Sequence, residues 1–293
     1  MTAVSERGSR SAPVTVRTKR PPSRSREILT AIGYTILAIA ILLGIWQLII
    51  VIAHPAAYVL PDIPSVLQAL KALVFADPSA PNTMWAELWS TLEGTLISFV
   101  LGAVVGVVVG VLMGEFAVVR RIIMPYLVAL QSLPKAALVP VIIAWVGYGI
   151  TSKITIGFIL AVFAVIVNTL QGVTAVDQNQ VHLVRSLGAG RWRELRYIRW
   201  RAALPSVFVG LELAIVYALL GVVVAEVLGA QSGIGVEITQ LESVSDTAAI
   251  FALLIILSIV GFVLHWLVAF AHRKFAWWDR PTSPRKRAAK PAA

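Results

Sequence analysis

Residues 177–205 read DQNQVHLVRSLGAGRWRELRYIRWRAALP and separate two long apolar parts of the chain. This stretch carries two acidic residues, Asp177 and Glu194, against six arginines. The arginines are Arg185, Arg191, Arg193, Arg196, Arg199 and Arg201. Because charged side chains are costly to place in hydrocarbon, the stretch must face water or a protein partner. The apolar segments on either side are therefore organised around an aqueous break.

The helical period predicts a two-helix elbow within this stretch. The apolar side chains of the first helix fall on one arc, which holds Leu183, Val184 and Leu187 with Val181 at its margin. The opposite side holds His182, Arg185 and Ser186. Gly188 and Gly190 supply the backbone freedom that a helix end needs, and a second helix is expected from Arg191. Two interpretations stay open: a charged loop that follows membrane topology rules, or a docking element for a soluble partner.

The composition is that of an integral membrane protein. Hydrophobic residues make up 58% of the chain and charged residues 14%, with a mean hydropathy of +0.83, whereas soluble domains carry about 25% charged residues. The net charge of +10 comes from basic residues confined to the two tails and the central elbow, so membrane topology explains it better than nucleic-acid binding does. No cysteine occurs, which excludes thiol catalysis, disulfides and cysteine metal sites.

Six apolar segments are long enough to cross a hydrocarbon core of roughly 30 Å as helices. They cover residues 29–52, 88–113, 122–145, 154–174, 205–228 and 248–270. The sequence therefore predicts an all-α integral membrane protein with six transmembrane helices in residues 29–275, including the elbow at 177–205. Residues 1–28 and 276–293 are expected to form basic tails, the first of them disordered.

The distribution of basic residues predicts the orientation of these spans. Both tails and the turns after the second and fourth spans are basic, and Arg120 and Arg121 mark the first of these turns. In the other connecting segments, 56–87, 147–153 and 229–246, the only basic residues are Lys71 and Lys153. Since positive charge collects on the cytoplasmic side, both termini are expected in the cytoplasm. The outer segment 56–87 is expected to carry a short surface helix over 65–75.

The second span carries glycines at strict four-residue spacing. They are Gly102, Gly106, Gly110 and Gly114. Glycines four residues apart lie on one helix face and let a neighbouring helix approach closely. The pattern favours a static packing face over a face along which two helices slide during function. In either case it predicts a bundle of several helices.

The third span contains Pro125, Pro134 and Pro140 together with Lys135. Proline removes a backbone donor and clashes with the preceding helical turn, so this span is expected to be bent or broken. Membranes tolerate such a break where protein covers it or where it lines a cavity. The candidates for lining a transport pathway are Pro134, Lys135, Pro140 and, in the fourth span, Asn168.

The chain lacks the chemistry of an enzyme. It has no Gly-x-x-x-x-Gly-Lys-Ser/Thr loop for nucleotide phosphates, so any ATP must be bound by a partner. The four histidines have no metal-ligand spacing, and Ser258 and His265 lie too far apart along one helix to act as nucleophile and base. Glu212 and Glu226 are the intramembrane acids that a stand-alone ion-coupled carrier would need. Both are expected near span ends, where hydration is the simpler explanation.

Four stretches, taken in order, resemble the permease subunits of binding-protein-dependent ABC importers of the nitrate/sulfonate/taurine branch. They are Leu60-Pro61 with Pro64-Ser65; residues 133–153 (LPKAALVPVIIAWVGYGITSK) with 163–173 (FAVIVNTLQGV); 186–205 (SLGAGRWRELRYIRWRAALP); and 225–235 (AEVLGAQSGIG). The third resembles the family's cytoplasmic coupling loop, written Glu-Ala-Ala-x-x-x-Gly and later Ile-x-Leu-Pro. Gly188 matches the glycine, Ile198 the isoleucine, and Leu204-Pro205 a second Leu-Pro common in the branch. His182, Leu183 and Val184 replace Glu-Ala-Ala, and Trp200-Arg201 replaces the first Leu-Pro.

The resemblance implies a type I ABC importer permease fold in the cell membrane. Two copies of the chain, expected as a homodimer, line the pathway for a small anionic or heterocyclic solute that an external binding protein delivers. The elbow docks on a cytoplasmic ATPase dimer, which binds the ATP, so no cofactor is expected in this chain. The implied interface consists of His182, Leu183, Val184, Arg185, Leu187, Gly188, Ala189 and Arg191. Leu183, Val184 and Leu187 supply apolar contact, Gly188 permits close approach, and Arg185 or Arg191 orients the helix. Gly188→Trp is expected to uncouple transport while leaving membrane insertion intact.

Overall fold

The computed structural model describes residues 24–77 and 83–278, and within them every regular element is a helix. The chain divides into two compact units at Pro55. The basic tails expected over 1–28 and 276–293 lie largely outside the described residues. Their inner ends are described: α1 begins at Arg24, and the chain continues to Trp278 after the last helix.

The described part of the first unit contains α1 (Arg24–Ala53), which is apolar from Ile32 onward. Its segment Ile32–Ala53 has 22 residues, enough to cross a membrane. The helix begins five residues before the predicted start of the span, because extending an existing helix costs little compared with nucleating one. It ends where His54 adopts a positive φ of 41° in front of Pro55.

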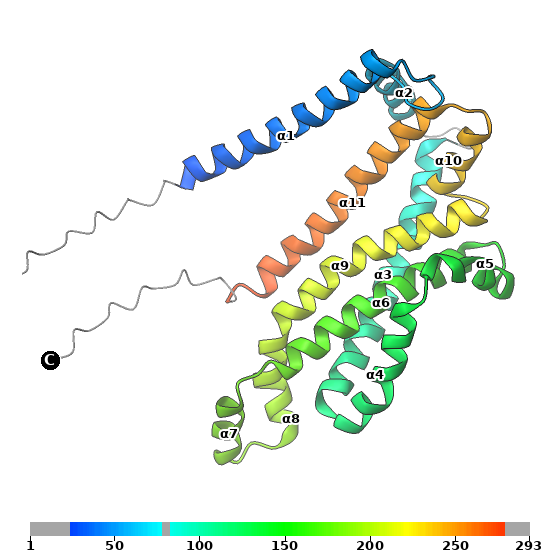
Figure 1. Cartoon of the computed structure of the whole chain (residues 1–293). Coiled ribbons are helices and arrows are strands. Elements are labelled where there is room, and N and C mark those ends of the chain that lie inside the picture. The colour runs from blue at the N-terminus through cyan, green and yellow to red at the C-terminus, as the bar shows by residue number, and fades with distance from the viewer. Residues whose placement is uncertain (1–23, 78–82, 279–293) are drawn as a thin grey trace, which may run out of the picture. The chain divides into compact units, whose positions relative to one another are not determined.

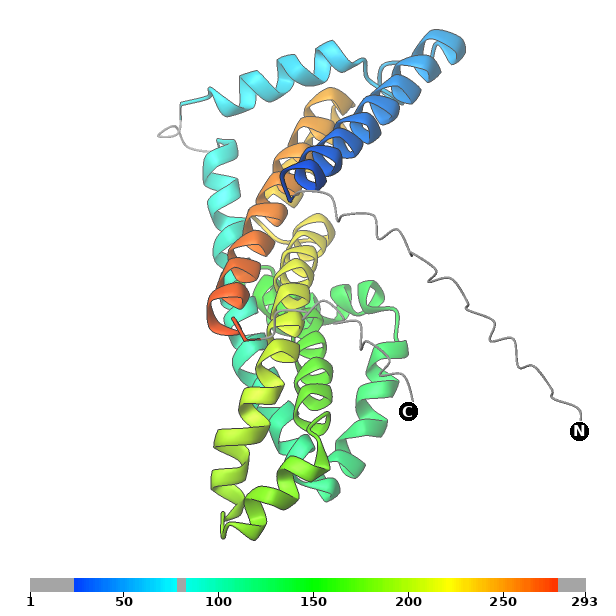
Figure 2. The ribbon, with the colours of Figure 1, turned by 90° about the vertical axis from the view of Figure 1, so that its left-hand side faces the viewer.

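The second unit holds the remaining helices, which Figures 1 and 2 show from two directions. They are α2 (Ile63–Val74), α3 (Met84–Glu115), α4 (Ala117–Ser132), α5 (Lys135–Val146), α6 (Ile150–Thr174), α7 (Gln178–Ser186), α8 (Arg191–Glu194), the π-helical turn η1 (Leu195–Arg199), α9 (Trp200–Leu228), α10 (Ile234–Ser243) and α11 (Thr247–Phe275). The helices α3, α6 and α9 pack side by side, and α11 lies along α9. The short helices α7 and α8 lie at one end of this bundle, and α10 lies at the other.

Five of the predicted spans are continuous helices, and the third is broken. The helices α4 and α5 together are apolar enough to form one span, but they meet at an angle of 109°. The break lies at Leu133 and Pro134, both in extended conformation. A residue that precedes proline is pushed out of the helical region, which explains why Leu133 ends α4. Pro125 and Pro140 are accommodated inside α4 and α5, so only one of the three prolines interrupts the span.

The all-α membrane architecture is confirmed, but the turn between the second and third predicted spans lies earlier in the sequence than expected. Arg120 and Arg121 were expected in a turn but lie inside α4. The reversal between α3 and α4 is made by the single extended residue Phe116. A one-residue connection suffices here because the α3 and α4 helices stop directly on either side of it.

The four spaced glycines of α3 face α6. A Cβ atom at Gly106, Gly110 or Gly114 would lie 2.5–2.6 Å from the Cβ or Cγ atoms of Val165, Thr169 and Val173 respectively. At Gly102 the nearest atom, the Cβ of Ala161, would be 3.0 Å away. The facing residues repeat every four positions as well, so two helix faces fit together over several turns. This is close helix packing of the kind that membranes favour.

The α6–α9 interface is equally tight, although no regular spacing in the sequence indicates it. Gly221 of α9 lies against Gly157 of α6, where an added Cβ would be 2.8 Å from the opposite Cα. Gly172 and Gly210 make similar approaches near the elbow end. The helices α3, α6 and α9 therefore form a rigid core on which the remaining helices are mounted.

Candidate functional site

The elbow projects from the rigid core as two short helices joined by a glycine turn. The first helix, α7, is capped by Asp177, whose carboxylate accepts a hydrogen bond of 2.9 Å from the backbone N–H of Asn179. Gly188 adopts a φ of +80°, a conformation that favours glycine, and reverses the chain. The second helix, α8, then starts at Arg191 and continues through η1 into α9.

The apolar arc of α7 is turned outward rather than onto the core. Leu183 and Leu187 are 62% and 78% exposed, whereas Val181, placed at the margin of the arc, is 1% exposed and anchors the helix. Val184 and Ala189 are half-buried, and His182 and Gly188 are exposed. Large apolar side chains at the tip of a projecting helix point to a protein contact.

Glu194 holds the elbow together through two arginines. Its carboxylate accepts a hydrogen bond of 2.8 Å from Arg185 Nε on α7 and one of 2.7 Å from Arg199 Nε on η1. Arg199 also lies 3.4 Å from a carboxylate oxygen of Glu115 at the end of α3. The Glu194 carboxylate raises the pKa of Arg185, because it stabilises the charged guanidinium. A series of ion pairs thus runs from Arg185 on α7 through Glu194 and Arg199 to Glu115 in the core.

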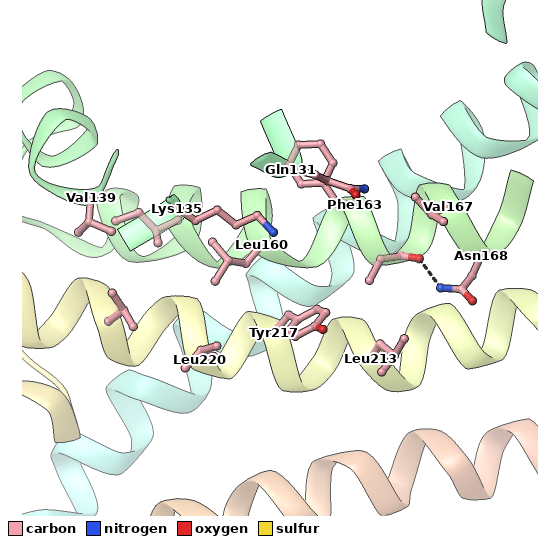
Figure 3. A pocket seen from close by; sticks show the side chains of 13 residues that line it. Gln131, Lys135, Val139, Leu160, Phe163, Val167, Asn168, Leu213, Tyr217 and Leu220 are labelled. Atoms are coloured by element: carbon pink, nitrogen blue, oxygen red, sulfur yellow. Dashed lines mark hydrogen bonds between the residues drawn. The ribbon is translucent and has the colours of Figure 1, made fainter. Parts of the chain in front are cut away.

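A second candidate site is a cavity of about 520 Å³ between the broken span and the helices α6 and α9. Figure 3 shows its polar side chains, which come from different helices: Gln131 from α4, Lys135 from α5, Asn168 from α6 and Tyr217 from α9. Apolar residues line the rest of the surface. The arrangement suits a small solute with a polar or charged group, since few polar groups in an apolar cleft fix the orientation of a ligand.

Two of the four predicted pathway residues line this cavity. The Lys135 ammonium lies 5.7 Å from the centre of the Phe163 ring, a cation–π distance. The side-chain amide of Asn168 donates a hydrogen bond of 2.8 Å to the carbonyl of Ala164, which leaves its oxygen available. Pro134 and Pro140 are exposed and lie outside the cavity lining. Proline sets the bend that brings Lys135 to the cavity, and it makes no contact there itself.

Sequence reasoning missed a buried polar cluster at the end of the core opposite the elbow. Lys153 was expected in a connecting turn and Glu226 in a hydrated position, and both expectations were wrong. The Lys153 ammonium and the Glu226 carboxylate are 2.9 Å apart, and their side chains are 1% and 0% exposed. Thr91 of α3 and the N–H of Gly235 also donate to Glu226. The cluster therefore ties α3, α6, α9 and α10 together.

Glu212, the other intramembrane acid, is paired as well. Its carboxylate lies 2.7 Å from Nδ1 of His272 on α11, and this imidazole stacks on Phe208 with ring centres 5.2 Å apart. The side chains of the pair are about one-fifth exposed. The contact fixes α11 on α9 near the elbow end, and the 60-residue separation hid it from sequence reasoning.

Comparison with known proteins agrees with this architecture. Residues 102–277 match the model of the family described as binding-protein-dependent transport system inner membrane component. The riboflavin transport system permease protein RibX of Chloroflexus aurantiacus is 30% identical over 91% of this chain and 97% of its own. The taurine transport system permease protein TauC of Escherichia coli is 28% identical over 87% of this chain and 91% of its own.

The fold is similar to that of solved importers. A structure titled as an inward-facing conformation of the MetNI methionine ABC transporter matches with a TM-score of 0.59 at 19% identity. The match covers 67% of this chain and 99% of that chain. An amino acid ABC transporter matches with a TM-score of 0.55 at 18% identity. The chain belongs to the binding-protein-dependent transport system inner membrane components and is a permease subunit of an ABC importer of the nitrate/sulfonate/taurine branch.

Proposed function

We propose that this permease lines the pathway for a small anionic or heterocyclic solute and couples its movement to a cytoplasmic ATPase dimer through the elbow. A second copy of the chain completes the pathway, and an external binding protein delivers the solute. Both termini and the elbow then lie in the cytoplasm, as the basic residues of the elbow favour. The observation that carries the proposal is the projecting helix α7, with its outward Leu183 and Leu187 and its charged connection to the core.

The elbow has the properties that mechanical coupling requires. Its tip offers apolar side chains to a partner, while Arg185 is held by Glu194 and therefore cannot swing freely. Arg199 connects the same carboxylate to Glu115 on α3. A partner that moves the tip would thus pull on α3 and α9 together, which is how a rigid-body transition is transmitted through a small contact.

The cavity supports the proposed class of solute. Lys135 is the cationic group among its lining residues, and Gln131, Asn168 and Tyr217 offer hydrogen bonds to a polar head. The rest of the lining is apolar or aromatic and suits a ring or a short carbon chain. Relatives are named for riboflavin, taurine, aliphatic sulfonates and formylaminopyrimidine. These solutes are heterocycles or carry a sulfonate.

The alternative of a stand-alone ion-coupled carrier has lost its support. It rested on Glu212 and Glu226 as free acids within the membrane. In the structure Glu226 is paired with the buried Lys153, and Glu212 with His272. An ion-coupling acid must exchange its ion with water, and Glu226 is closed off from water on all sides.

The test replaces Leu187 by aspartate and measures both ATPase capture and solute uptake. Leu187 is 78% exposed, so Leu187→Asp is expected to leave folding intact while it weakens the apolar contact with the ATPase. Gly188→Trp is expected to act likewise, but the φ of +80° adds backbone strain and makes it the less clean probe. Val244→Asp is the matched control, because Val244 is also a 71% exposed apolar residue but lies beyond α10, at the other end of the bundle.

The expected result is loss of a co-purifying Walker A protein and of uptake in Leu187→Asp, with the Walker A protein retained in Val244→Asp. The tagged chain would be purified from its own membranes in mild detergent, and the stoichiometry of bound proteins measured by mass spectrometry. Wild-type uptake by Leu187→Asp would show that the elbow is not the coupling element.

A further inference from the structure

A pocket on the elbow side of the second unit is separate from both the elbow tip and the solute cavity. It has a volume of about 830 Å³ and lies where α9 begins and where the chain leaves α11. Its lining includes Arg196 and Arg201, the indole rings of Trp200, Trp277 and Trp278, and Gln180 of α7. We call it the arginine–tryptophan pocket.

Within the part of the chain that the structure describes, neither arginine of this pocket is paired with a carboxylate. Arg185 and Arg199 share Glu194, but Arg196 and Arg201 have no acidic side chain within ion-pair distance among residues 24–77 and 83–278. Both are exposed. Two neighbouring guanidinium groups without a counter-charge attract an anion, and their planar donors fit phosphate oxygens particularly well.

The pocket lies at the elbow-side ends of two helices that are long and apolar enough to cross a membrane. The apolar segments of α9 and α11 extend to this side of the bundle, and the last turn of α11 carries His272, Arg273 and Lys274. Trp277 and Trp278 follow directly and are largely exposed, with their rings in edge-to-face contact. Exposed tryptophans beside basic residues at a helix end are typical of the membrane–water interface.

We propose that the arginine–tryptophan pocket binds the phosphate head group of an anionic phospholipid. The guanidinium groups of Arg196 and Arg201 contact the phosphate, and the indole rings border the glycerol region, where apolar and polar surfaces meet. A phospholipid fits better than a soluble phosphate, because the pocket opens beside helices whose outer faces are apolar and can accompany the acyl chains.

The position of the pocket links lipid binding to the elbow. Gln180 belongs to α7, Arg196 to η1 and Arg201 to α9, so the pocket lining joins the first elbow helix to the start of α9. A bound phosphate would therefore fix the elbow relative to α9. This consequence does not depend on which solute is transported.

The experiment measures lipid binding by the full chain reconstituted in nanodiscs. Nanodiscs of phosphatidylcholine alone are compared with nanodiscs that contain increasing fractions of phosphatidylglycerol, and the thermal unfolding midpoint is followed. The double variant Arg196→Gln/Arg201→Gln removes the proposed contacts. The control Arg120→Gln/Arg121→Gln removes the same charge from two exposed neighbouring arginines of α4 that lie outside the pocket.

The wild type and the control are expected to be stabilised at the same phosphatidylglycerol fraction. The pocket variant is expected to need at least about tenfold more phosphatidylglycerol than the wild type for the same rise in melting point. The reason is that each arginine near an anionic surface adds to the attraction, and the variant loses two of them. If both double variants changed the phosphatidylglycerol dependence equally, the effect would come from overall charge and not from the pocket, and the proposal would be overturned. Stabilisation by inorganic phosphate in phosphatidylcholine nanodiscs would identify a soluble anion instead. Unchanged lipid dependence with loss of the co-purifying ATPase would assign the surface to that partner.

Discussion

Replacing Glu226 by glutamine tests whether the buried cluster holds together the end of the core that lies away from the elbow. The substitution keeps the size of the side chain but removes its charge, so the Lys153 ammonium stays buried with Ser90 Oγ, 2.8 Å away, as its remaining partner. Breaking a buried ion pair from one side costs about 3–5 kcal/mol. The glutamine oxygen in the Oε2 position still accepts from Thr91 and Gly235, but the amide nitrogen then faces the Lys153 ammonium, so the expected loss is at least about 3 kcal/mol.

The complementary variant Lys153→Met leaves the Glu226 carboxylate without its cation. Two neutral donors remain, the Thr91 hydroxyl, which lies 3.0 Å from both carboxylate oxygens, and the Gly235 N–H. These donors reduce the cost of the buried charge but do not cancel it, so we again expect a loss of about 3 kcal/mol. The double variant Lys153→Met/Glu226→Met removes both charges and restores an apolar interior. Its loss is expected to be clearly smaller than the sum of the single losses.

The measurement is the thermal unfolding midpoint of the detergent-purified chain, and the readout at each temperature is the fraction of protein that remains monodisperse. A loss of 3 kcal/mol corresponds to a drop of roughly 6–12 °C for a chain of this size. Single variants that melt within about 2 °C of the wild type would refute the reasoning. So would a double variant whose loss equals the sum of the two single losses, because additivity means that the two charges do not interact.

Two further predictions concern the glycine seam and the solute cavity. Gly110→Ala places a Cβ 2.6 Å from Thr169 Cβ and is expected to lower the stability of the fold by about 1–3 kcal/mol through overpacking. Gly94→Ala on the same helix is the control and is expected to be close to neutral, because its nearest atom lies 3.4 Å away. Equal melting points for the two variants would contradict close packing of α3 on α6. Lys135→Gln is expected to raise the KM for uptake about tenfold, which is the effect of losing one charge-assisted contact. Lys135→Arg keeps the charge and is expected to retain most of the affinity. A KM that is unchanged in both variants would place the solute elsewhere.

Sequence reasoning succeeded where a local pattern carries the information. The spacing of Gly106 and Gly110 predicts a packing face because residues four apart share a helix side, and Pro134 predicts a break because proline constrains the residue before it. Neither pattern names the partner. That α6 supplies the facing Val165 and Thr169 follows only from the tertiary structure.

The buried polar cluster was missed because its residues pair over a long distance in the sequence. Lys153 and Glu226 are 73 positions apart, and each alone is best explained as a charge near the water surface. The elbow shows the same limit at short range. Periodicity correctly groups Leu183 with Leu187, but a period cannot tell which side of a helix packs inward, and in the structure the marginal Val181 is the buried residue.

The distribution of close contacts explains how a small elbow can act on a large bundle under the proposed coupling. The backbones of α3, α6 and α9 touch at glycines along their length, and the Lys153–Glu226 cluster ties their ends at the side away from the elbow. Such a closely packed unit moves as a body, because its interfaces do not deform gradually. Arg199 joins the elbow to α3 through Glu115, while α9 continues from the elbow without a break. Displacement of α7 by a partner would therefore be passed to the whole core, and α4 and α5 would follow through Leu127 and Val139, which are buried against it.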